Sequence, residues 1–182
     1  VENHFKDMGL PIFFLERIKP MFLSAFATSD MNPNSLKDGS IKSYEMAFYE
    51  ISQDRNMTTG GLETIDFQVS VFDSIPYKEQ AKMLVESLKT LDEDNGELDK
   101  LVSLYKAQDI DAMVNTMSSE NSELAPYEDI LLNGRNKTWI PQIIQQAKLQ
   151  TTFFAVGAGH LAGSNGVIHL LRKEGYKVKP VK

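Results

Sequence analysis

Residues 151–163 read TTFFAVGAGHLAG, and this stretch decides the predicted fold. Its first six residues are β-branched, aromatic or small and apolar, which is typical of a buried strand. Glycines then break the pattern around His160. The apolar spacing of residues 167–171 predicts a helix, ended by Gly175 as its C-terminal cap, and residues 176–181 predict a closing strand. We therefore expect a strand–turn–helix–strand unit at this end of the chain.

The remainder of the chain has mainly helical patterns. Pro11 and Pro20 are expected to begin helices, and residues 29–40 are rich in turn-forming residues. A short strand is predicted at residues 57–62. Apolar residues recur at helical spacing in five segments: 44–51, 81–91, 98–105, 110–117 and 139–147. Together these patterns predict a mixed α/β protein that is rich in helix.

Composition excludes several kinds of protein. The 182 residues are enough for one domain with a core, and the net charge of −6 argues against a nucleic-acid-binding surface. The chain has no cysteine, which excludes disulfides, thiol catalysis and thiolate metal sites. No apolar run approaches the ~20 residues of a membrane span. The chain begins with Val1 rather than methionine, so we expect it to be processed or cut from a longer protein.

The turn around His160 has three interpretations. Gly157, Gly159 and Ala162 fit the dinucleotide pattern G-x-G-x-x-A. Against it, the second predicted strand ends at Lys182 without the acidic residue that binds ribose. Alternatively, a neutral imidazole at a strand end could bind a divalent metal or act as a general base. The third interpretation is a histidine that only caps a turn, and for a lone histidine this is the more common case.

Two other positions carry candidate chemistry. Glu63 lies after two glycines at the end of the predicted short strand, with Gln68 about one helical turn further on. It could ligate a metal or act as a general base, or it could only balance a helix dipole. Arg135, in Gly134-Arg135-Asn136, could bind a carboxylate through two hydrogen bonds or be an ordinary surface arginine.

Taken in order, four segments resemble the TraB/GumN family, which includes the animal Tiki proteases. They are GGLETIDFQ (60–68), PYKEQAKML (76–84), GRNKTWIPQI (134–143) and FFAVGAGHLAGSNGVIHLLRKEGYKV (153–178). The resemblance implies a mixed β-sheet flanked by helices, similar to erythromycin esterases. It also implies metal-dependent proteolysis, with manganese or cobalt favoured over zinc, which suits a site without thiolates.

The resemblance also implies roles for individual residues. The family has a pair of G-x-x-H motifs, and Gly157-Ala158-Gly159-His160 matches the second. His160 and Glu63 are then expected to bind the metal, with Glu63 also activating water. Arg135 is expected to stabilise the oxyanion or hold a substrate carboxylate, and Asn136 to orient the substrate by hydrogen bonding. Gly157, Gly159 and Gln68 are expected to shape the substrate-binding part of the site.

The first G-x-x-H motif has no counterpart in this chain, since His4 lies in VENH. We therefore expect residues 1–182 to be one family domain that is truncated at its N-terminus. Such a chain could be inactive, could hold no metal, or could associate with another copy. The resemblance further implies a peptide or protein substrate and an extracytoplasmic location. The alternative function is a non-catalytic peptide-binding or regulatory protein.

Overall fold

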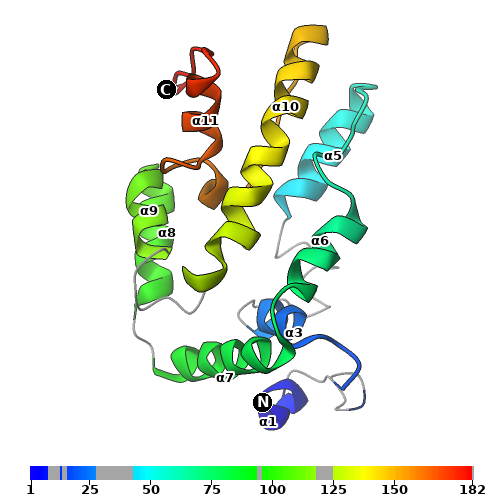
Figure 1. Ribbon diagram of the computed structural model, residues 1–182. Coiled ribbons are helices and arrows are strands. Elements are labelled where there is room, and N and C mark those ends of the chain that lie inside the picture. Colours follow the sequence, from blue (N-terminus) through cyan, green and yellow to red (C-terminus); the bar gives the residue numbers. More distant parts are fainter. Residues whose placement is uncertain (8–12, 14–15, 28–42, 94–95, 118–124, 182) are drawn as a thin grey trace. The chain divides into compact units, whose positions relative to one another are not determined.

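The helices predicted from apolar spacing are present close to their predicted positions (Figure 1). A computed structural model describes residues 1–7, 13, 16–27, 43–93, 96–117 and 125–181. These residues divide into two compact units, the first made of Val1–Gly61 with Phe72–Asn95 and the second of Leu62–Val71 with Gly96–Lys182. Each unit has its own buried apolar cluster.

The first unit is built around the contact between helices α3 (Pro20–Ala27) and α7 (Tyr77–Glu93). Its buried cluster contains Phe5, Leu23, Leu84 and Leu88, with Ile18 packed against it. Leu84 and Leu88 belong to the stripe that predicted α7, so the apolar spacing there identified the buried face correctly. The helices of this unit are α1 (Glu2–Asp7), α3 (Pro20–Ala27), α5 (Tyr44–Asp54) and α7 (Tyr77–Glu93).

A fully buried glutamine links the elements of the first unit. Gln80 donates from Nε2 to the carbonyls of Phe72 and Ile75, at 2.9 and 2.8 Å, and its Oε1 accepts from the Met21 amide at 3.3 Å. Nearby, Lys19 forms an ion pair with Asp73. Because each polar atom of Gln80 has a partner, its burial carries no unsatisfied-group penalty.

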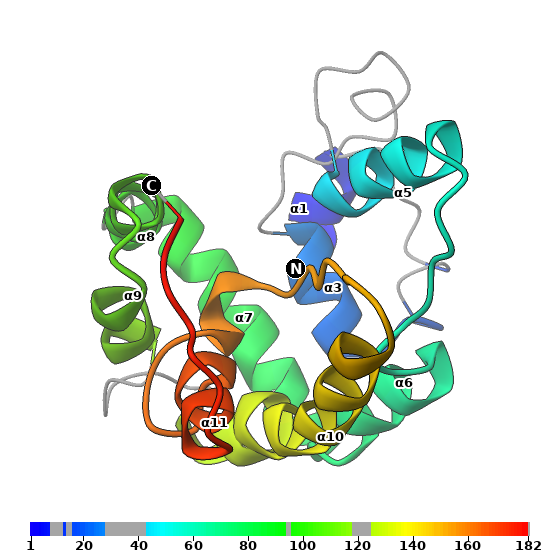
Figure 2. The same ribbon diagram turned by 90° about the horizontal axis from the view of Figure 1, so that it is seen from above.

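The second unit contains all the predicted site residues. Its core cluster contains Trp139, Ile140, Ile143 and Val167, and Phe154 and Val156 pack against it. Each such side chain contributes roughly 1.5–3 kcal/mol when fully buried. Helices α10 and α11 contact each other, as do α8 and α9 (Figures 1 and 2). Its elements are α6 (Ile65–Asp73, shared with the first unit), α8 (Glu97–Ala107), α9 (Ile110–Met117), η1 (Ala125–Tyr127), η2 (Asp129–Asn133), α10 (Gly134–Leu149), η3 (Ala158–His160) and α11 (Val167–Lys173).

Several helix ends follow the predicted signals. Pro20 is the first residue of α3, and α7 begins directly after Pro76. Gly175 follows α11 with φ +87°, a conformation that favours glycine. Pro11 and residues 29–40 lie outside the described residues.

The predicted β-sheet is wrong: the described residues contain no strand. Residues 151–156 alternate between exposed and partly buried, so their period-2 pattern is real. Phe154 and Val156, two of the partly buried residues, pack against the core cluster. A strand, however, is defined by ladder hydrogen bonds to a neighbour, and no other described segment supplies them. The same applies to residues 57–62 and 176–181, so the expected mixed α/β class is corrected to a helical fold.

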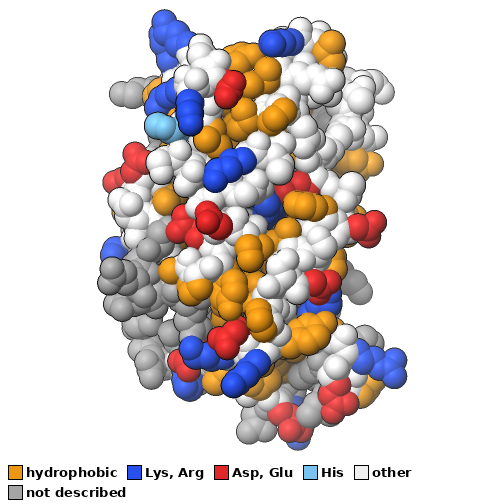
Figure 3. Space-filling view, in the orientation of Figure 1, with side chains coloured by type: hydrophobic (Ala, Val, Ile, Leu, Met, Phe, Trp, Pro, Cys, Tyr) orange, Lys and Arg blue, Asp and Glu red, His pale blue; other side chains and the backbone are white. Residues whose placement is uncertain are grey.

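The surface gives two further observations. On the face drawn in Figure 3, Lys and Arg side chains are interspersed with Asp and Glu and do not gather into one patch. Within the described ranges, no helix is both long enough and apolar enough to cross a membrane.

Candidate functional site

Glu63 and Arg135 form the ion pair around which the site is built. Arg135 Nε lies 3.0 and 3.1 Å from Glu63 Oε1 and Oε2, and Nη2 donates to Oε2 at 2.7 Å. Nη1 donates to the Leu131 carbonyl at 3.0 Å. Only 4% of the Glu63 side chain and 19% of the Arg135 side chain are exposed. This two-point contact between a planar guanidinium and a carboxylate orients both groups strongly.

Trp139 completes the arrangement, although the sequence suggested only a core role for it. Its Nε1 donates to Glu63 Oε1 at 2.8 Å, and the Arg135 Cζ lies 5.2 Å from the centre of its ring. The ring centre of His160 lies 4.5 Å from that of Trp139. Arg135 and Trp139 are four residues apart and so share one face of α10. Trp139 is the single tryptophan of the chain, and this was the one feature of the sequence that could have indicated its place in the site.

Asn136 fixes the tautomer of His160. The amide Nδ2 of Asn136 donates to the Asn165 carbonyl at 2.9 Å, which can only accept. The remaining Oδ1 lies 2.7 Å from His160 Nδ1, so the proton in that hydrogen bond belongs to the histidine. In the neutral imidazole, Nε2 then carries the lone pair. Asn165 was missed in the sequence because it lies in the turn after the motif.

The surroundings of Glu63 favour its charged form. Burial raises the pKa of the carboxyl, but the hydrogen bonds from Arg135 and Trp139 lower it more. The charge of Arg135 and a hydrogen bond from Gln68 act in the same direction, so the pKa lies below the ordinary value. Glu63 is therefore an ionised carboxylate with donors on both oxygens.

The surroundings of His160 favour its neutral form. Burial and, after it, the charge of Arg135 lower the pKa of His160 from 6.5 to about 4, although the charge of Glu63 opposes them. At neutral pH the imidazole is uncharged. Its Nε2 has no hydrogen-bond partner among the described residues, and it is not a fully buried orphan. A lone pair on an oriented ring can bind a metal or accept a proton.

Local backbone structure places these side chains. Thr64 Oγ1 accepts from the Phe67 amide at 3.1 Å and so caps α6, directly after Glu63. The π-helical turn η2 directly precedes α10, whose second and third residues are Arg135 and Asn136, and a Cβ at Gly134 would lie 2.8 Å from the Asp129 carbonyl oxygen. Such turns occur often at functional sites. A Cβ at Gly166 would lie 2.0 Å from the Ala162 carbonyl oxygen, so the turn that carries Asn165 requires glycine.

The structure thus brings together Glu63, Gln68, Arg135, Asn136 and His160. The predicted glycines, Gly157 and Gly159, contribute to the site only through the backbone around His160. The Gly157 carbonyl accepts from the His160 amide at 2.9 Å, which forms the η3 turn, and Gly159 faces the Met117 side chain. No described strand leads into this turn, so the context of a dinucleotide fingerprint is missing within the described ranges.

The geometry also limits how a metal could bind. Among the described residues there is no group of three or more His, Cys, Asp or Glu side chains that could hold a metal ion. His160 offers one suitable nitrogen. Both oxygens of Glu63 already accept hydrogen bonds, so a metal bound to Glu63 would displace Arg135 or Trp139. The roles predicted for these residues stay predictions.

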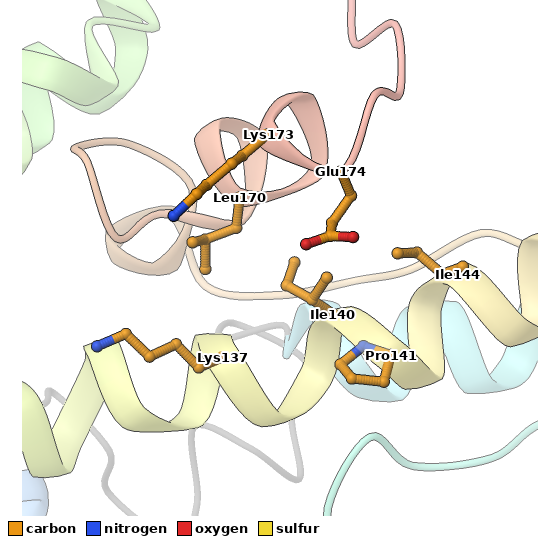
Figure 4. Close-up of a pocket in the computed structure, with 7 residues that line it drawn as sticks. All are labelled: Lys137, Ile140, Pro141, Ile144, Leu170, Lys173 and Glu174. Atoms are coloured by element: carbon orange, nitrogen blue, oxygen red, sulfur yellow. The ribbon is translucent and has the colours of Figure 1, made fainter.

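Residues of α10 line parts of two cavities. One of about 380 Å³ lies between α10 and α11, with an apolar floor that includes Ile140 and Leu170 (Figure 4). Lys137, Lys173 and Glu174 surround that floor, and none of the predicted site residues lines this cavity. The other, of about 240 Å³, is lined by Asn136 and Gly159 and therefore adjoins the His160 network.

Comparison with curated proteins finds distant metalloprotease relatives. The chain is 22% identical over 191 residues to Metalloprotease TIKI1 of Danio rerio, which covers 90% of this chain and 38% of that protein. It is 32% identical over 71 residues to a Metalloprotease TIKI homolog of Amphimedon queenslandica, covering 35% of this chain and 14% of that protein. Metalloprotease TIKI2 of Xenopus tropicalis is 30% identical over 100 residues, 43% of this chain and 19% of that protein. The chain therefore spans well under half the length of these relatives.

No solved structure matches this chain. The model of the TraB/PrgY/gumN family, in contrast, matches residues 1–180, which include Glu63, the Arg135-Asn136 pair and the turn around His160. This match confirms the resemblance inferred from the four sequence segments. The chain belongs to the TraB/PrgY/gumN family.

Proposed function

We propose that this chain forms part of a metal-dependent peptide hydrolase, with His160 as one of the metal ligands. The observation that carries the proposal is the state of His160. Its ring is neutral, its Nδ1–H is held by Asn136, and its Nε2 is available. A second hydrogen bond that fixes ring orientation is the usual feature of metal-binding histidines. The distant relationship to proteins named as metalloproteases supports the same chemistry.

A bound divalent cation would supply a nucleophilic water near neutral pH and polarise the scissile carbonyl. The residues of this chain would position the metal ligand and stabilise the negative charge that develops on the substrate. Asn136 holds the His160 ring, and Trp139 packs against it. Three of the five N–H groups of Arg135 bind Glu63 and Leu131. The other two, one on each Nη, have no partner among the described residues and can donate to the carbonyl oxygen of a substrate as negative charge develops there.

In this proposal Glu63 acts mainly by holding Arg135. With its pKa lowered and both oxygens accepting hydrogen bonds, it is a poor proton acceptor. It could bind a metal or activate water, the roles that the family resemblance implies, if Arg135 turned toward the substrate and released one oxygen. The metalloprotease relatives make a peptide or protein the proposed substrate. The extracytoplasmic location implied by the family resemblance stays a prediction.

One observation favours the second candidate, a non-catalytic peptide-binding protein. At the candidate site, the described residues supply one available ligand, His160, and the carboxylate beside it is engaged in an ion pair. A groove with such a paired carboxylate can bind a peptide without any metal. The two candidates differ in whether the protein binds a divalent ion.

Calorimetric titration of Mn²⁺, Co²⁺ and Zn²⁺ into the protein separates them. Saturable binding that is lost in His160→Ala and retained in His169→Ala supports the proposal, since His169 is an exposed residue of α11. Peptide hydrolysis that depends on the same metal and on His160 would then complete the case. If the folded protein binds none of the three ions, the metal-dependent function is wrong and the peptide-binding candidate stands.

A further inference from the structure

The cavity of about 240 Å³ adjoins the His160 network and is lined in part by Asn136 and Asn165, which belong to that network. Residues of α9, of η2 and of the turn at 162–165 line it, and all of them lie in the second unit. Asn136, which binds His160 through its side chain, forms part of the wall, as does Gly159. Anything held in this cavity therefore lies beside the candidate site.

The lining is rich in neutral amides and carries one charge. Among the described residues that line the cavity, Glu128 is the single charged side chain. Around it lie the polar side chains of Asn115, Asn133, Ser164 and Asn165. The described part of the lining contains no lysine or arginine, so nothing in the wall neutralises the carboxylate.

One oxygen of Glu128 is held in place and the other is available. Asn133 Nδ2 donates to Glu128 Oε1 at 3.1 Å, and the same nitrogen donates to Asp129 Oδ1 at 3.0 Å. Glu128 Oε2 has no hydrogen-bond partner among the described residues. A carboxylate oriented in this way accepts strongly from a cationic donor.

We infer that this cavity is a binding site for a basic side chain, lysine or arginine, of a peptide. A guanidinium or ammonium group carries only donors, and the cavity offers it the Glu128 carboxylate and the surrounding amide and hydroxyl oxygens. An acidic side chain is repelled by Glu128. The volume is below the ~300–1,000 Å³ of typical small-molecule pockets and suits a single side chain. As a statement about the substrate, this inference rests on the proposed function; as a statement about binding, it does not.

The test compares two probes of similar size and shape, one cationic and one neutral. N-acetylarginine amide and its neutral counterpart N-acetylcitrulline amide are titrated into the metal-free protein, and amide chemical shifts are followed by NMR. We expect the arginine probe to bind about fivefold or more tightly than the citrulline probe, from one charge-assisted hydrogen bond. The shift changes are expected at Val114, Asn115 and Ser164, which line the cavity.

Variants assign the preference to the cavity. Glu128→Gln is expected to bring the two affinities within about a factor of two, while Glu174→Gln, which removes the same charge at the other cavity, leaves the ratio unchanged. If Glu128→Gln does not fold, Asn115→Leu narrows the cavity from an exposed position of α9 and is expected to weaken both probes. Equal affinity of the probes for the unmodified protein, or shifts located elsewhere, would overturn the inference. Because no metal is present, this result is independent of the metal titration, and either proposal can fail alone.

Discussion

The Asn136 side chain binds one donor and one acceptor: its Oδ1 is 2.7 Å from His160 Nδ1, and its Nδ2 is 2.9 Å from the Asn165 carbonyl oxygen. Only 1% of the Asn136 surface is exposed, so its side chain is almost closed off from bulk solvent. This single amide therefore connects the turn at residues 158–165 to helix α10 and decides which nitrogen of His160 carries the proton.

Replacing Asn136 by leucine, which has a similar size, should remove the preference of His160 for the Nδ1–H tautomer. The Nδ1–H form is expected to lose its dominance, because His160 no longer has an acceptor at Nδ1. The free energy of unfolding should fall by about 1–3 kcal/mol, since the Asn165 carbonyl loses its donor. Imidazole ¹⁵N chemical shifts report the tautomer, and urea denaturation reports the stability. An unchanged ¹⁵N pattern would show that another group sets the proton position.

His160 should make stability depend on pH on the acid side of neutrality. Its pKa falls from 6.5 to about 4 on folding, mainly through burial. Between these pH values the unfolded chain binds the proton and the folded chain does not. The contribution of His160 to the free energy of unfolding is therefore highest above pH 6.5 and falls as the pH drops toward 4. Urea unfolding at several pH values should therefore show a shallower slope for His160→Asn than for the unmodified protein in this window. If the free energies of unfolding of the two proteins changed with pH in parallel, His160 would not be the source of the pH dependence.

Removing the charge of Glu63 should destabilise the second unit strongly. Glu63→Gln leaves the guanidinium of Arg135 without its anion at a site where the Glu63 side chain is 4% exposed. Breaking such a pair costs about 3–5 kcal/mol in free energy of unfolding. Chemical denaturation measures the change. The matched control is Glu86→Gln in the exposed pair with Lys89, where a loss below about 1 kcal/mol is expected. Similar losses in both variants would mean that the Glu63 pair is no better than a surface pair.

Gly166 and Gly60 should respond differently to alanine. A Cβ at Gly166 would lie 2.0 Å from the Ala162 carbonyl oxygen, so the turn that carries Asn165 must move. We expect Gly166→Ala to lower stability by more than about 2 kcal/mol and to disturb the His160 resonances, because strained backbone changes are among the large effects. At Gly60 a Cβ meets nothing within 4 Å, and alanine there should change stability by less than about 1 kcal/mol. Thermal unfolding of the two variants gives the comparison.

Much of the helical structure was predictable because its signals are local. The stripe ending in Leu84 and Leu88 identified α7 and its buried face, and Pro20 marked the start of α3. Residues 151–156 do alternate between exposed and partly buried, but they form no strand. The conclusion drawn from this alternation was wrong, since a sheet requires a second segment at hydrogen-bonding distance, and period-2 alternation in one segment carries no information about that neighbour.

The sequence by itself determined the helices, the family and the identity of the residues that could do chemistry: Glu63, Arg135, Asn136 and His160. Only the tertiary structure decided which groups each of them contacts. Glu63 and Arg135 are 72 positions apart in the chain and meet as a two-point ion pair, and Trp139 joins them through a hydrogen bond that no spacing rule predicts. Whether a carboxylate is a base, a ligand or an anchor depends on burial and on the donors around it, and those are set by contacts between distant segments.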